Sequence, residues 1–82
     1  MKSLTWQQAK DIANLIRPRL SPEELAKLDA VVQYATECPS IDACDTFCDG
    51  MAALVGTAHE DQPAVLEKLR SDMAFIYHYQ PA

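Results

Sequence analysis

The sequence predicts an all-α protein, a small single-domain four-helix bundle. Apolar residues recur at helical spacing in four segments, and residues that favour helix starts and ends stand between those segments. No segment alternates polar and apolar residues between turn signals, as a half-buried strand would. The 82 residues, 49% of them apolar, suffice for one core and are too few for two. Because the connections are short, we expect mostly antiparallel neighbours, or a close variant in which the first helix packs across the others.

The first helix is predicted over residues 6–17. Thr5 and Gln8 have the form of a capping box, in which each residue satisfies a free amide at the helix start. Apolar residues then recur at helical spacing until Pro18 stops the pattern.

The second helix, over residues 22–37, has the clearest start. Ser21 is placed to accept a hydrogen bond from the free amide of Glu24, and Pro22 suits the first helical position. The helix should end before Pro39, because a residue that precedes proline avoids the helical conformation.

The third helix, over residues 41–55, has the most regular apolar stripe in the chain. We expect Ser40 as its N-cap and Gly56 as a left-handed cap at its end. The stripe predicted to face the core consists of Ile41, Cys44, Phe47, Cys48, Met51, Leu54 and Val55.

The fourth helix is predicted over residues 62–79, after a polar connection at residues 57–61. Pro63 stands near its start and Pro81 beyond its end, two positions where proline is tolerated. Its predicted core stripe consists of Val65, Leu66, Leu69, Met73, Ile76 and Tyr77.

Three cysteines allow two interpretations. Cys44 and Cys48 lie one helical turn apart, a spacing that can chelate a soft metal, with Cys38 nearby and His59 or His78 as a fourth ligand. The paired knuckles of zinc sites are missing, however, and both helical thiols fall on the apolar stripe, where cysteine packs as a small hydrophobe. We therefore predict packed, reduced thiols and no metal or other cofactor. The alternative is a thiol- or metal-dependent sensor that uses Cys38, Cys44 and Cys48.

No motif in the chain indicates catalysis. There is no Gly-rich phosphate loop, no nucleophile elbow, and no Cys or Ser with a convincing histidine partner. His59 lacks a second histidine at helical spacing, and Glu60 and Asp61 suit the positive end of the fourth helix. No apolar run is long enough for a bilayer span or a signal peptide. We expect a soluble, cytoplasmic protein that is not an enzyme.

The charge is unevenly distributed along the chain. A net charge of −5 opposes direct binding to nucleic acid or to an anionic membrane. Residues 28–67 contain eight Asp and Glu residues and no Lys or Arg. Half of the chain therefore has no basic residue of its own, and the expected partner is neutral or basic.

Three of these acids share one side of the third helix. At about 100° per residue, Asp42, Asp45 and Asp49 fall within roughly 60° of one another, opposite the apolar stripe. Solvation and the helix dipole account for the first two. Asp49 lies beyond the first turn, and Glu37 falls near the end of the second helix, where the dipole disfavours an anion. These acids indicate a surface for a partner, unless Arg17 or Arg19 neutralises them in the fold.

Two aromatic residues also stand apart from the core stripes. Phe75 and Tyr79 are four residues apart and lie off the stripe of the fourth helix. They either pack against a second neighbouring helix or form an exposed contact site.

Together these features predict a small acidic helical module that binds and occludes a basic surface on another macromolecule. In size, acidity and lack of a catalytic motif the chain resembles phage-encoded inhibitors of bacterial machinery, including anti-CRISPR proteins that cover nucleic-acid channels. The resemblance covers composition and architecture, and it implies an inhibitor whose partner is a nucleic-acid-binding protein or complex. A self-associating structural subunit, a homo-oligomer, is a further alternative. The candidate contact residues are Glu37, Asp42, Asp45, Asp49, Phe75 and Tyr79.

Overall fold

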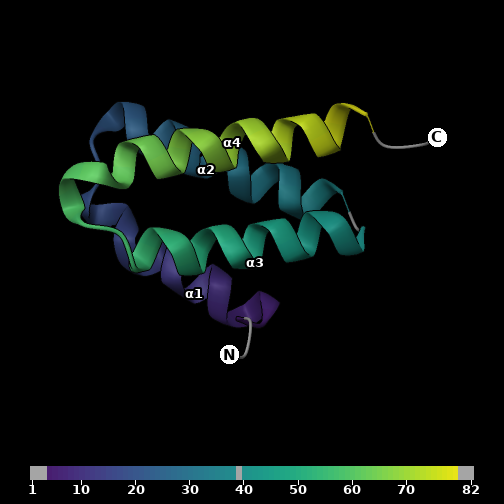
Figure 1. Ribbon diagram of the computed structural model, residues 1–82, viewed down its shortest axis with the longest axis horizontal. Coiled ribbons are helices and arrows are strands. Elements are labelled where there is room, and N and C mark those ends of the chain that lie inside the picture. Colours follow the sequence, from purple (N-terminus) through teal and green to yellow (C-terminus); the bar gives the residue numbers. More distant parts are fainter. Residues whose placement is uncertain (1–3, 39, 80–82) are drawn as a thin grey trace.

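The computed structural model describes residues 4–38 and 40–79. These residues contain four α-helices, namely α1 (Trp6–Ile16), α2 (Pro22–Glu37), α3 (Ile41–Val55) and α4 (Gln62–His78) (Figure 1). Two 3-10 helices, η1 (Arg17–Arg19) and η2 (His59–Asp61), connect α1 to α2 and α3 to α4. No strand occurs in the described part of the chain. The predicted all-α four-helix fold is confirmed.

All three predicted N-caps are present. Thr5 forms a complete capping box, in which its side chain accepts from the Gln8 amide and its own amide donates to the Gln8 side chain. The Ser21 Oγ accepts from the Glu24 amide at 3.3 Å, and the Ser40 Oγ accepts from the Ala43 amide at 3.1 Å. Each cap satisfies an amide that the first turn leaves without a partner, which fixes where the helix begins.

The ends of the helices differ from the predictions in three places. The α-helical part of the first helix ends at Ile16, and Pro18 lies within the tighter turn of η1. Gly56 ends α3 in the right-handed region, with φ −81°, so the predicted left-handed cap is wrong. α4 ends at His78, one residue before the predicted end, and the predicted polar connection that precedes this helix contains η2. Pro39 and Pro81 lie outside the described residues.

The helices form a flattened bundle that measures 37 × 29 × 18 Å. Figure 1 shows α3 and α4 side by side with opposite directions, α2 behind α4, and α1 against α3. Consecutive helices alternate in direction, as short connections favour. The close packing of α4 on α2, which run the same way, comes from the tertiary arrangement.

The core lies where α2, α3 and α4 meet, and α1 closes it from the side of α3. Phe47 is fully buried, and the ring of Trp6 packs on it with the ring centroids 5.1 Å apart. Leu28, Met51 and Met73 fill the space between the three central helices. The predicted stripe of the third helix was too wide, because Ile41 and Val55 at its ends are 79% and 53% exposed. The buried residues that complete the core are Ala9, Ala13, Val31, Ala35, Cys38, Ala43, Cys48, Leu54, Leu66 and Leu69.

Candidate interaction surface

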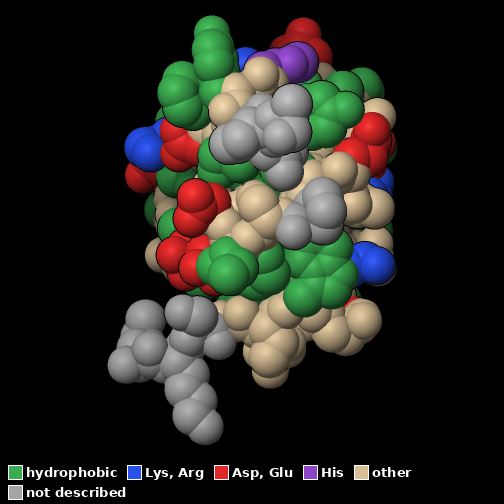
Figure 2. Space-filling view, turned by 90° about the vertical axis from the view of Figure 1, so that its right-hand side faces the viewer, with side chains coloured by type: hydrophobic (Ala, Val, Ile, Leu, Met, Phe, Trp, Pro, Cys, Tyr) green, Lys and Arg blue, Asp and Glu red, His purple; other side chains and the backbone are tan. Residues whose placement is uncertain are grey.

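Asp42, Asp45 and Asp49 lie on α3 and are all exposed, as predicted. We call these three residues the acidic ridge. Ala43 and Phe47, on the opposite side of the helix, are fully buried, so the backbone of the ridge is anchored in the core. Figure 2 looks at the end of the molecule where α3 begins and α4 ends, and Asp and Glu side chains gather along one side of that end.

Four basic side chains, those of Arg17, Lys27, Lys68 and Arg70, form ion pairs with acids outside α3. Arg17 pairs with Asp29 on α2, so it does not neutralise the acidic ridge. Lys68 pairs with Asp72 within α4, with 3.0 Å between the Nζ and a carboxylate oxygen. Across residues 4–38 and 40–79, no Lys, Arg or His lies within ion-pair distance of an acidic-ridge carboxylate. In the described part of the chain, the carboxylates of the acidic ridge therefore form no ion pair.

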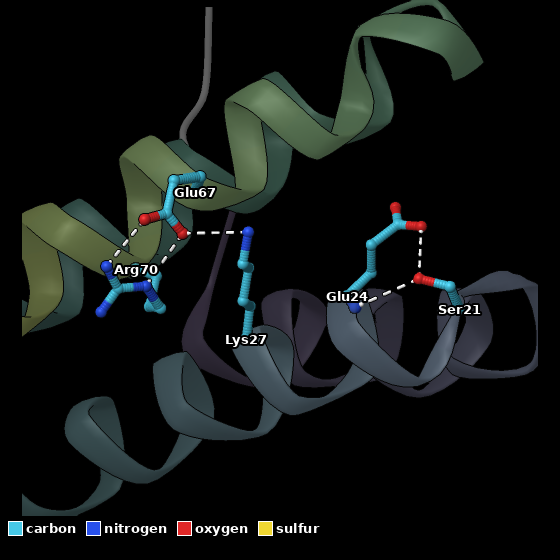
Figure 3. A network of polar contacts seen from close by, with 5 residues as sticks. All are labelled: Ser21, Glu24, Lys27, Glu67 and Arg70. Carbon is cyan, nitrogen blue, oxygen red and sulfur yellow. Dashed lines mark hydrogen bonds and ion pairs between the residues drawn. The ribbon is translucent and has the colours of Figure 1, made fainter.

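The largest ion-pair group holds α2 to α4 (Figure 3). The Glu67 carboxylate accepts two hydrogen bonds from Arg70, at 3.0 and 2.8 Å, and lies 3.3 Å from the Lys27 Nζ on α2. The hydrogen bonds from Arg70 and then from Lys27 lower the pKa of Glu67 to about 2. The same figure shows the Ser21 cap, whose Oγ also donates to the Glu24 carboxylate at 2.8 Å.

Glu37 is exposed but has a partner within the fold. The Tyr77 hydroxyl of α4 donates to its carboxylate at 3.2 Å, and this hydrogen bond raises the pKa of the Tyr77 hydroxyl. The ring of Tyr77 lies against that of Tyr34 on α2, with centroids 5.0 Å apart. Glu37 therefore lies on the α2 side of α4, apart from the acidic ridge on α3. An anion at the end of α2 is explained by a contact between helices, which the sequence did not show.

Phe75 and Tyr79 form an exposed pair on α4. Their side chains are 63% and 73% exposed, and the rings stack with centroids 4.7 Å apart and an interplanar angle of 30°. The structure therefore has the exposed pair and not the alternative of packing against a second helix. Lys68 and Asp72 precede the pair at helical spacing, so all four residues share one stripe of α4.

A groove of about 440 Å³ runs between α3 and α4. Because these helices are antiparallel, the start of α3 lies beside the end of α4 (Figure 1). Of the six residues predicted to contact a partner, Asp49 lines the groove, and the other acids of the ridge and the aromatic pair lie on the two helices that form it. The sequence analysis missed the groove itself, although small residues on α3 were a signal for it. The lining residues are Thr46, Asp49, Gly50, Ala53, Val65, Lys68, Leu69 and Asp72.

The cysteines divide into two buried thiols and one that is partly buried. Cys38 and Cys48 are 1% and 3% exposed. Burial, and next the neighbouring Cys44 thiol, raise the pKa of Cys48 to about 11. Cys38 and the partly buried Cys44 line a second pocket of about 420 Å³, together with Trp6, Ala35, Thr36, Ser40 and Ile41. In the part of the chain that the structure describes, no three His, Cys, Asp or Glu side chains are arranged to hold a metal ion.

The two histidines lie before the start of α4 and at its end. His59 is exposed on η2. His78 packs at the end of α4 with its ring edge against Tyr34 and Tyr77, at centroid distances of 6.1 and 5.3 Å. The two imidazoles are therefore far apart in the chain and in separate surroundings.

None of the helices within residues 4–38 and 40–79 has the length and apolar character needed to cross a membrane. No family model, curated protein or solved structure matches the chain.

Proposed function

We propose that this protein binds a basic surface of another protein and covers it, using the acidic ridge and the exposed aromatic pair. The single observation that carries the proposal is the charge of Asp42, Asp45 and Asp49, which form no ion pair among the described residues and lie on a helix whose opposite face is anchored in the core. Acidic residues held on a rigid element attract a basic partner and speed its association.

The stacked rings of Phe75 and Tyr79 support the same proposal. Exposed aromatic side chains supply apolar contact area with little loss of side-chain freedom, and they are enriched where proteins bind one another. Charge would thus guide the encounter, and the aromatic pair would hold the complex. Glu37 is not part of this surface. Its carboxylate accepts a hydrogen bond from the Tyr77 hydroxyl, on the other side of α4.

The mechanism that we propose is occupancy, with no bond made or broken. A basic surface that binds nucleic acid would be blocked by a folded acidic domain that competes for it. An inhibitor of bacterial machinery that acts in the cytoplasm, in the manner of anti-CRISPR proteins, is the form of this proposal that small size and acidity favour.

The test begins with affinity capture from the native cell and identification of the partner by mass spectrometry. Binding of the purified partner is then measured with the parent protein and with a variant that carries Asp42→Lys, Asp45→Lys and Asp49→Lys. We expect the association rate to fall by about tenfold or more in the variant, and the affinity of the parent to fall as salt rises.

A matched control variant reverses the charge of three exposed acidic residues at the other end of the bundle. The changes Glu23→Lys, Glu60→Lys and Asp61→Lys alter the net charge by the same amount and also lie near helix starts. The control should keep most of its affinity. Equal losses in the two variants would show that only net charge matters, and the proposed surface would then be wrong.

A further inference from the structure

The groove between α3 and α4 could accommodate one more helix. On α3 it is lined by the exposed Ala53 and by Gly50, against which Leu69 of α4 packs. On α4 it is lined by Val65 and Leu69, which supply an apolar floor. In this fold α1 packs on α3 and α2 packs on α4 on other sides, so no described helix covers the groove (Figure 1).

The two rims of the groove differ in charge. The α3 rim carries Asp49 of the acidic ridge, which forms no ion pair among the described residues although Lys68 lines the opposite rim. On the α4 rim, Lys68 and Asp72 neutralise each other and the apolar rings of Phe75 and Tyr79 follow. A complementary occupant therefore has basic side chains along one edge and apolar side chains along the other.

The dimensions of the groove match a short helix. On α3 the groove is lined from Thr46 to Ala53, about 10 Å along the axis at roughly 1.5 Å per residue. The acidic ridge continues beyond the groove to Asp42, about 17 Å from Ala53. An α-helix of about three turns covers that length with three apolar residues at spacings of three and four.

From these features we infer that the α3–α4 groove binds one basic amphipathic α-helix of the partner, an inference that rests on the proposed function. The apolar stripe of that helix lies over Gly50, Ala53 and Val65, and its basic residues face the acidic ridge. Arginine fits the end of the groove better than lysine, because a planar guanidinium can stack on the Phe75–Tyr79 pair while it bonds to a carboxylate.

Synthetic peptides test the inference without knowledge of the partner. One labelled peptide of about 12 residues has leucines at positions i, i+3 and i+7 and arginines along one flank. The second has the same composition in an order without an amphipathic stripe. Fluorescence anisotropy should show the amphipathic peptide to bind roughly tenfold more tightly than the scrambled one. A third peptide, with lysine for every arginine, should bind more weakly than the first.

A pair of adjacent alanines supplies matched variants of the protein. Ala52 and Ala53 are both exposed on α3, but only Ala53 lines the groove. Ala53→Gln should lower the affinity for the amphipathic peptide about tenfold and leave the affinity for the scrambled peptide unchanged. The longer polar side chain would fill part of the groove and block the peptide. Ala52→Gln should change neither.

The outcomes separate this inference from the proposed function. If both peptides bind equally and both lose affinity on charge reversal of the acidic ridge, the groove inference is overturned and the proposed function stands. Equal effects of Ala53→Gln and Ala52→Gln would overturn the inference in the same way. If the protein proves to be a dimer that Ala53→Gln dissociates, a second copy occupies the groove and the inference is wrong. The proposed function is wrong if charge reversal of the acidic ridge leaves the binding of the captured partner unchanged.

Discussion

Gly50 shows how a single residue without a side chain fixes the spacing of two helices. A glycine inside a helix is destabilising by about 0.5–1 kcal/mol relative to alanine. At position 50, however, a Cβ would come within 2.4 Å of the Cδ1 and 2.9 Å of the Cγ of Leu69, whose side chain is 4% exposed. The glycine therefore lets α4 approach α3 closely, and its conformational cost is offset by that packing.

We expect Gly50→Ala to destabilise the protein despite the better helix propensity of alanine. The added methyl group must displace Leu69 in a packed core, which typically costs about 1–3 kcal/mol. Urea unfolding followed by circular dichroism measures the change. Gly56→Ala is the control, because a Cβ there meets only backbone oxygens at 3.5 Å and 3.8 Å and the φ angle suits alanine. A midpoint for Gly50→Ala at or above that of the parent would contradict the close-packing argument.

The three thiols should differ in reactivity, because thiolate formation and access both control alkylation. Cys44 is partly buried at a pocket, whereas Cys38 and Cys48 are almost fully buried and the pKa of Cys48 is raised to about 11. At pH 8 we expect one thiol, that of Cys44, to react with iodoacetamide in the native protein, and all three to react in urea. Peptide mass spectrometry identifies the labelled residue. Fast native labelling of Cys48 would show that the α3 packing described here is wrong.

The three sides of α4 have different surroundings. Leu66, Leu69 and Met73 are buried in the core, and Tyr77 contacts α2. The stripe that ends in Phe75 and Tyr79 is left to solvent. A helix with two packed sides and one exposed aromatic stripe can lose the stripe without losing its place in the bundle.

The double change Phe75→Ser and Tyr79→Ser should therefore lower the free energy of unfolding by no more than about 1 kcal/mol, the value of an exposed stacked pair. Met73→Ala, one turn away in the core, should cost about 2–5 kcal/mol. Thermal and urea unfolding compare the two. A loss in the aromatic double variant as large as that of Met73→Ala would place the pair in the packed core.

At the scale of the whole molecule, ion pairs connect elements that are distant in sequence. Arg17 joins the end of the first helical segment to Asp29 on α2, and Glu67 joins α4 to Lys27 on α2. These two pairs hold Arg17 and Lys27 on acids of α2 and α4, and among the described residues the acids of α3 form no ion pair. The asymmetric surface is a consequence of how the helices pack and not of composition alone.

Glu67 should make the stability of the whole fold depend on pH in the acidic range. Its pKa is about 2 in the folded chain, against an ordinary value of 4.5. Above pH 4.5 the carboxylate is ionised in both the folded and unfolded states, and the full stabilisation is present. As the pH falls from 4.5 towards 2, the unfolded chain binds a proton more readily than the folded chain, so the free energy of unfolding decreases.

The variant Glu67→Gln lacks this carboxylate and should lose less stability than the parent between pH 4.5 and 2. Urea midpoints measured across that range make the comparison. Glu60→Gln, an exposed acid without an ion pair in the described structure, serves as the control and should follow the parent. A parallel loss in the parent and in Glu67→Gln would mean that the contacts with Arg70 and Lys27 contribute little in solution.

The four helices, their caps at Thr5, Ser21 and Ser40, and the exposure of the acidic ridge could all be predicted from the amino-acid sequence. These features depend on hydrogen bonds over three or four residues and on the 3.6-residue period, both of which can be read locally. Other features follow only from the packing of the helices: Arg17 pairs with Asp29, the Tyr77 hydroxyl donates to Glu37, and a groove lined by Asp49, Lys68 and Asp72 runs between α3 and α4. Such contacts join residues far apart in the chain, and they depend on which sides of the helices the core brings together, which a local period does not specify.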